Sequence, residues 1–201
     1  LFADHSCLNL YDCPTAVHID GVDFGMIPWI CKENESVVFN FLKNTPLNVV
    51  CGHFELKNHE VFRGIKFHGG ISDDFLKNFE LVMSGHFHVK SSYRNIHYLG
   101  TQYEMSFADV EDEKGFHVFD TTTRTLEFIK NPRKLFYSIK YSDMKSQENF
   151  DKFENKFVKL FIDEDVTRLK IDNLIEKIES HSPFDLTVVE NFSVEHKEIK
   201  S

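Results

Sequence analysis

The chain has 201 residues, of which 41% are hydrophobic, 27% charged and 14% aromatic. This composition excludes intrinsic disorder and collagen, and it suffices for one core with a small appended domain. The formal net charge of -9 excludes non-specific nucleic-acid binding over the whole surface, because phosphate affinity depends on clustered Lys and Arg. No apolar stretch approaches the roughly 20 residues of a membrane span, and no basic-then-apolar leader opens the chain, so we expect a cytoplasmic protein without membrane association.

The four cysteines follow irregular spacings that contain no C-x-x-C pair, which argues against a zinc knuckle and a disulfide scaffold and predicts buried thiols. They are Cys7, Cys13, Cys31 and Cys51. The chain begins with Leu1 rather than Met, and its first 14 residues start in mid-pattern. We therefore expect the sequence to be part of a longer protein.

The first predicted elements alternate between strand and helix. Residues 22–30 are rich in apolar side chains and predict a strand that breaks near Pro28, because proline cannot donate to a central ladder. A helix follows, capped by Asn34 or Ser36, with apolar residues at helical spacing and an end at Thr45. The pattern predicts a crossover from one strand to the next.

The same alternation continues to about residue 130. Residues 47–51 and 81–84 are short apolar strands of the kind buried on both faces, and Ser72 can cap a short helix between them. Further strands are predicted at 95–99 and as a hairpin of 115–120 with 124–129. This order of elements is typical of a layered α/β domain.

The order of predicted elements changes after residue 133. Strands are predicted at 135–141, 157–163 and 184–190, with a helix before the last strand. In that helix four apolar residues stand at i, i+3, i+4 and i+7, namely Ile171, Leu174, Ile175 and Ile178. We therefore divide the chain into residues 1–132 and a small α+β domain at 133–201.

Two histidines follow glycines at the ends of the two apolar strands. Residues 50–54 and 83–87 repeat the order strand, small residue, Gly, His, Phe, so that His53 and His86 stand 33 positions apart. If the strands are parallel, both histidines leave the carboxyl edge of the sheet, where open α/β sheets bind ligands. His88 would face the same side on an extended backbone. Three converging imidazoles predict a site for Mn, Fe, Zn or Ni.

Each of these histidines also has a plainer interpretation, since a histidine after a glycine is often a turn residue or a satisfied core residue. Basic residues near the second copy favour a phosphate ligand. Lys90 and Arg94 lie with three histidines in residues 86–97, where no acidic residue occurs. These two side chains are candidates for DNA binding, although short basic loops also arise by chance in acidic proteins.

The motifs together resemble a known family. G-H-F-E at 52–55, S-G-H-F-H at 84–88 and Y-L-G-T at 98–101 are similar to the second half of a calcineurin-like metallophosphoesterase. Within that superfamily they are most similar to the SbcD-type DNA repair exonucleases, particularly the recombination endonuclease subunits of T-even-like phages. The resemblance covers roughly residues 10–130 and implies part of a layered β-sandwich flanked by helices, with the β-α-β tail as a capping domain.

The resemblance implies a two-metal phosphodiesterase that uses manganese, with magnesium as an alternative, and acts on DNA ends in a bacterial cell. His53 and His86 would bind one metal and His88 the other. The implied partners are an SbcC-type SMC-like ATPase and a second copy of the same subunit. The family's earlier motifs D-x-H, G-D and G-N-H-D/E are absent from this sequence, so no residue is assigned as catalytic. We expect the chain alone to bind metal weakly and to hydrolyse DNA poorly.

Two other functions remain open. A calcineurin-like phosphoesterase that acts on small nucleotides or phosphoproteins would use the same histidines. A non-catalytic module that binds the ATPase partner or a second copy would need the fold and none of the ligands. The tail favours the nuclease by analogy only, and the missing upstream ligands favour the binding module for this chain taken alone.

Overall fold

The computed structural model describes residues 8–147 and 149–190, and its Cα positions fall into two compact units. The first unit contains the described residues up to Tyr103 together with Asp112–Asn131. The second contains Glu104–Glu111 together with the described residues from Pro132 onward. The α/β composition of both units agrees with the predicted fold class.

The segment Glu104–Glu111 differs from the predicted division, which placed it in the first domain. The buried Glu104 carboxylate accepts hydrogen bonds from the backbone N–H groups of Leu135 and Phe136, at 2.7 and 2.9 Å. Phe107, at the start of the 3₁₀ helix η2 (Phe107–Asp109), packs edge-on against the Phe136 ring. These contacts attach the segment to the second unit, and nothing local in its sequence indicates them.

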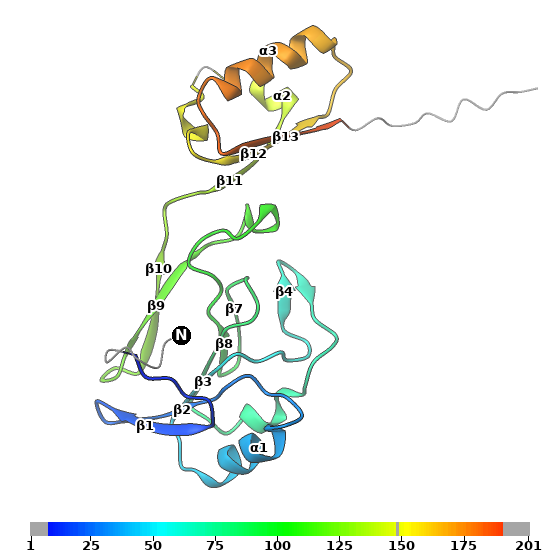
Figure 1. Ribbon diagram of the computed structural model, residues 1–201. Helices are drawn as coiled ribbons and strands as arrows, with labels where there is room; N and C mark the ends of the chain where they lie inside the picture. Colours follow the sequence, from blue (N-terminus) through cyan, green and yellow to red (C-terminus); the bar gives the residue numbers. More distant parts are fainter. Residues whose placement is uncertain (1–7, 148, 191–201) are drawn as a thin grey trace, which may run out of the picture. The chain divides into compact units, whose positions relative to one another are not determined.

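A six-stranded sheet forms the centre of the first unit, in the order β1-β2-β3-β6-β8-β7 (Figure 1). Its strands are β1 (Thr15–Ile19), β2 (Val22–Met26), β3 (Val49–Gly52), β6 (Leu81–Ser84), β7 (Ser91–Tyr93) and β8 (Ile96–Tyr98). The four central strands are parallel, and the edge strands β1 and β7 are antiparallel to their neighbours. The predicted parallel pairing of the two apolar strands is confirmed, since β3 and β6 pair from Val49 with Leu81 to Gly52 with Ser84.

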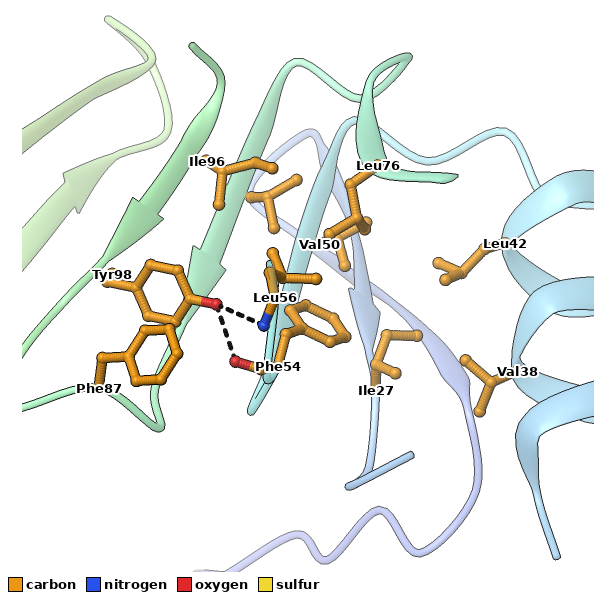
Figure 2. Packing of buried hydrophobic residues seen from close by; sticks show 11 residues of the cluster. Ile27, Val38, Leu42, Val50, Phe54, Leu56, Leu76, Phe87, Ile96 and Tyr98 are labelled. Atoms are coloured by element: carbon orange, nitrogen blue, oxygen red, sulfur yellow. Dashed lines mark hydrogen bonds between the residues drawn. The ribbon is translucent and has the colours of Figure 1, made fainter. Parts of the chain in front are cut away.

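Both faces of this sheet are covered. On one face Val38 and Leu42 of α1 (Glu35–Asn44) point toward Ile27 and the central strands, and the 3₁₀ helix η1 (Asp73–Leu76) adds Leu76 (Figure 2). On the other face the hairpin of β9 (Gly115–Asp120) and β10 (Thr125–Lys130) contributes Phe119 to a second apolar cluster. The sheet therefore lies between a helical layer and a β layer. A short two-stranded sheet, β4 (Glu60–Phe62) with β5 (Ile65–Lys66), follows the loop after β3.

The Asn34 side chain stabilises the turn that precedes α1. Asn34 occupies the N-cap position, as predicted, but its side chain does not bond to the first turn of the helix. Its Oδ1 accepts from the backbone N–H of Cys31, and its Nδ2 donates to the backbone oxygen of Trp29, both at 2.8 Å. This residue therefore fixes the turn that carries Trp29. Ser72 does cap η1, since its Oγ accepts from the backbone N–H of Asp74.

The prediction of buried thiols is wrong for two cysteines. Cys13 and Cys31 lie in loops outside the helices and strands, and both are exposed. Cys51 is half-buried in β3, where burial raises the pKa of its thiol to about 11. Cys7 lies outside the described residues.

The second unit is a three-stranded parallel sheet with helices in its crossovers. Its strands, in the order β11-β12-β13, are β11 (Phe136–Lys140), β12 (Phe157–Ile162) and β13 (Asp185–Glu190). The connections contain α2 (Tyr141–Met144), the 3₁₀ helix η3 (Asp151–Phe153) and α3 (Arg168–Glu179). The predicted amphipathic helix is confirmed as α3, which buries Ile171, Leu174 and Ile178. No helix in the described part of the chain is long and apolar enough to cross a bilayer.

His59 makes the stability of the first unit sensitive to acid. Its side chain is 3% exposed, with Nε2 3.7 Å from Asp73 Oδ2. Burial lowers its pKa, and Asp73 opposes that effect in part. Below about pH 6.5 the unfolded chain takes up a proton that the folded state resists, so stability should fall as pH falls through and below that value.

Urea unfolding between pH 8 and pH 5 tests this expectation. His59→Gln should flatten the loss of stability on acidification, and Asp73→Asn should steepen it, because the opposing carboxylate is then gone. Parallel pH profiles for the two variants and the parent chain would show that His59 does not carry the effect.

Candidate functional site

The candidate site lies at the carboxyl edge of β3 and β6. These parallel strands end together, and the backbone N–H of Gly85 donates to the oxygen of Gly52 at 3.0 Å. His53 directly follows β3, and His86 follows β6 after Gly85. Their ring centroids are 5.3 Å apart, with the rings at 80° to each other. The predicted meeting of these two imidazoles is confirmed, and we call them the histidine pair.

Backbone geometry explains the residue types on either side of the pair. A Cβ atom at Gly85 would lie 2.6 Å from Nδ1 of His53, so only glycine lets that ring lie across the second loop. His86 has a φ of +88°, a left-handed conformation that non-glycine residues rarely adopt. Such strain is found at functional sites, where the surrounding structure holds it.

Two buried hydroxyls hold the His53 loop in place. Ser84 Oγ accepts from the backbone N–H of Phe54 and donates to the backbone oxygen of Gly85, both at 2.9 Å. The Tyr98 hydroxyl donates to the oxygen of Phe54 at 2.9 Å and accepts from the N–H of Leu56 at 3.2 Å (Figure 2). Burial raises the pKa of Tyr98, so its hydroxyl stays protonated and can donate. Sequence reasoning assigned neither residue a role, and only their presence in the quoted motifs pointed to them.

The charge state of His53 suits ligand binding. Partial burial lowers the pKa of His53, and the neighbouring His86 lowers it further. The His53 ring is therefore neutral at neutral pH, as a metal-binding imidazole must be. Glu55, also missed as a functional residue, places Oε2 3.6 Å from Nε2 of His86.

Trp29 completes the edge on the side of α1. Its ring centroid lies 5.6 Å from that of His53 and 5.2 Å from that of His86. It also borders a pocket of about 150 Å³. The pocket is lined by Trp29, Ile30, His53, Phe54, Glu55, Gly70 and Ile71.

The third predicted ligand is placed differently. The His88 side chain is exposed, and its backbone oxygen accepts from Lys114 Nζ at 2.9 Å and from the N–H of Thr101 at 3.2 Å. Across the described residues, no group of three or more His, Cys, Asp or Glu side chains is arranged to hold a metal ion. The predicted three-imidazole cluster is therefore not preformed. On an extended backbone His88 would face the same side as His86. The backbone is not extended there, because His86 adopts a left-handed conformation.

The described residues fit part of a metal centre. Two imidazoles that meet at one sheet edge can occupy one side of a coordination sphere. A two-metal centre needs further ligands, usually with bridging carboxylates, and the described residues do not complete that set.

The two candidate DNA-binding residues differ in their surroundings. Lys90 Nζ lies 3.3 Å from Glu113 Oε2 and 3.9 Å from the centre of the Phe128 ring, so its charge is partly compensated. Arg94 lies in a tight turn with a φ of +56°, is exposed, and stacks over Tyr93 at 4.9 Å. Arg94 is thus the more accessible of the two cations.

Fold and site together define an α/β protein with a histidine pair at the carboxyl edge of parallel strands, the usual ligand-binding position of such sheets. No known protein-family profile matches the chain. Over 179 residues it is 35% identical to Exonuclease subunit 1 of Enterobacteria phage T4, an alignment that covers 89% of this chain and 52% of that protein. The chain thus spans about half the length of this curated relative. The comparison supports a relation to phage nucleases.

Proposed function

We propose that this chain is part of a metal-dependent DNA nuclease of the calcineurin-like type, the exo/endonuclease subunit of an SbcCD-like recombination and repair complex. The observation that carries the proposal is the histidine pair, with centroids 5.3 Å apart at the ends of two parallel strands. The similarity to a phage exonuclease subunit supports the same activity. The reaction proposed for the intact protein is therefore the hydrolysis of phosphodiester bonds in DNA.

Each residue of the edge has a role in this proposal. His53 and His86 would hold one divalent ion and His88 a second, manganese or magnesium, which when bound would polarise the phosphate and activate water. Ser84 and Tyr98 fix the His53 loop through their buried hydrogen bonds. Glu55 beside His86 would orient that ring, as carboxylates next to metal-binding histidines do.

Substrate and partners follow from charge and from the relative's name. Because the chain carries a net charge of -9, contact with DNA would depend on local cations, with Arg94 the more accessible and Lys90 the second. The relative is named as a subunit. We infer a complex with an SbcC-type ATPase and a homodimer in the intact protein.

Cleavage of end-labelled linear DNA by the intact protein tests the function. With manganese we expect phosphodiester cleavage that chelation by EDTA abolishes and that added manganese restores. The 201-residue chain alone should be much less active, because its described residues do not complete a metal centre. Hydrolysis of small phosphate esters without cleavage of DNA would instead support the phosphoesterase alternative, and ATPase binding without any hydrolysis would support the interaction module.

A further inference from the structure

The pocket beside the histidine pair has a composition that the metal chemistry does not require. Most of its lining is apolar and comes from Trp29, Ile30, Phe54 and Ile71, with the His53 ring on one side. Its volume is about 150 Å³. A phosphate group gains nothing from such walls, because burying a charged group against apolar surface is unfavourable. The pocket instead suits a flat, largely apolar group attached to a phosphate.

Trp29 provides an aromatic face at this pocket. Its side chain is 47% exposed, although large aromatic residues are normally well buried. The Asn34 side chain fixes the backbone at Trp29 through a 2.8 Å hydrogen bond, and the indole ring lies against the rings of His53 and His86, with centroids 5.6 and 5.2 Å away. Exposed aromatic rings are the platforms on which proteins stack unpaired bases.

Glu55 provides a polar group at the same pocket. Its side chain is 38% exposed, and its carboxylate lies beside His86. Carboxylates recognise bases by accepting from exocyclic amino groups, such as N4 of cytosine. An aromatic face with an adjacent carboxylate acceptor therefore matches a base that carries an amino group better than thymine.

We propose that this pocket binds an unstacked nucleobase, which stacks on Trp29 and donates its amino group to Glu55. The inference rests on the proposed nuclease function, because His53 belongs both to the pocket lining and to the histidine pair. A nucleotide with its base in the pocket would then have its phosphate next to the pair. The pocket would thus select single-stranded or frayed DNA ends, whose bases are free to leave the stack.

The fluorescence of Trp29 tests the proposal directly, because Trp29 is the one tryptophan in the sequence. The 201-residue chain is titrated, without added metal, with dCMP, dAMP, TMP, deoxyribose 5-phosphate and inorganic phosphate. We expect saturable quenching by dCMP and dAMP, binding of TMP weaker by roughly fivefold or more, and no quenching by the two compounds that lack a base.

Three variants assign the contacts. Glu55→Ala should bring the affinities for dCMP and TMP together. Trp29→Ala, followed by calorimetry because the reporter is lost, should weaken dCMP binding by roughly 5- to 100-fold, and Trp29→Phe should restore part of it. Circular dichroism of each variant checks that the fold is kept.

The outcomes separate this proposal from the nuclease assignment. Absence of quenching by every nucleotide, or equal quenching by inorganic phosphate, overturns the base pocket and leaves DNA cleavage by the intact protein to be judged by its own assay. Base-selective quenching in a protein that does not cleave DNA supports the pocket and overturns the nuclease.

Discussion

Replacing His86 with alanine in the intact nuclease is expected to reduce the manganese-dependent cleavage rate by roughly 100-fold or more. Loss of a residue that merely orients a metal ligand typically costs 10- to 100-fold, and His86 is proposed as a ligand itself. Its ring lies 5.3 Å from that of His53. His53→Ala should therefore have a comparable effect, and the double variant should lose little more, because both residues act as one unit.

Initial rates on end-labelled DNA at saturating manganese give the measurement, and His88→Ala is compared in the same assay as the proposed ligand of the second ion. His18→Ala is the matched control, since it removes an exposed histidine of the edge strand β1. Unchanged cleavage by the His86 variant, or an equal loss in the control, would remove the histidine pair from the mechanism.

Lys114→Met is expected to lower the free energy of unfolding by about 3–5 kcal/mol, the usual cost of breaking a buried ion pair. The Lys114 side chain is 3% exposed and that of Asp112 is 8% exposed, with Nζ 3.5 Å from Oδ2. Methionine has a similar length but carries no charge, so the Asp112 carboxylate would stay buried without its partner. The variant also removes the 2.9 Å bond to the backbone oxygen of His88.

Urea unfolding of the chain measures this effect, with the double variant Lys114→Met/Asp112→Leu as the comparison. Removing both charges should recover a large part of the lost stability, because the main cost is the uncompensated carboxylate. A single variant as stable as the parent chain would show that Lys114 does not anchor the His88 loop.

The spacing of apolar residues in the sequence correctly predicted those strands and helices whose burial depends on the pattern within the element itself. Short apolar runs predicted β3 and β6, and helical spacing predicted α1 and α3. The repeat of glycine and histidine after two such strands predicted the meeting of His53 with His86. Parallel strands place their carboxyl ends at one edge by geometry alone, so the meeting of the two histidines follows once β3 and β6 pair side by side.

What only the tertiary structure decided depends on contacts between distant segments. Cys13 and Cys31 lie in exposed loops rather than in the core. Among the described residues His88 does not complete a metal-binding cluster, because the chain makes a left-handed turn at His86.

Ser84 and Tyr98 became anchors only when the fold brought them to the Phe54 backbone. In the same way, Trp29 and Glu55 line one pocket because loops from different crossovers meet there. Hydrophobic periodicity records which face of an element is buried, but it carries no information about which loop residue from elsewhere in the chain will lie beside it.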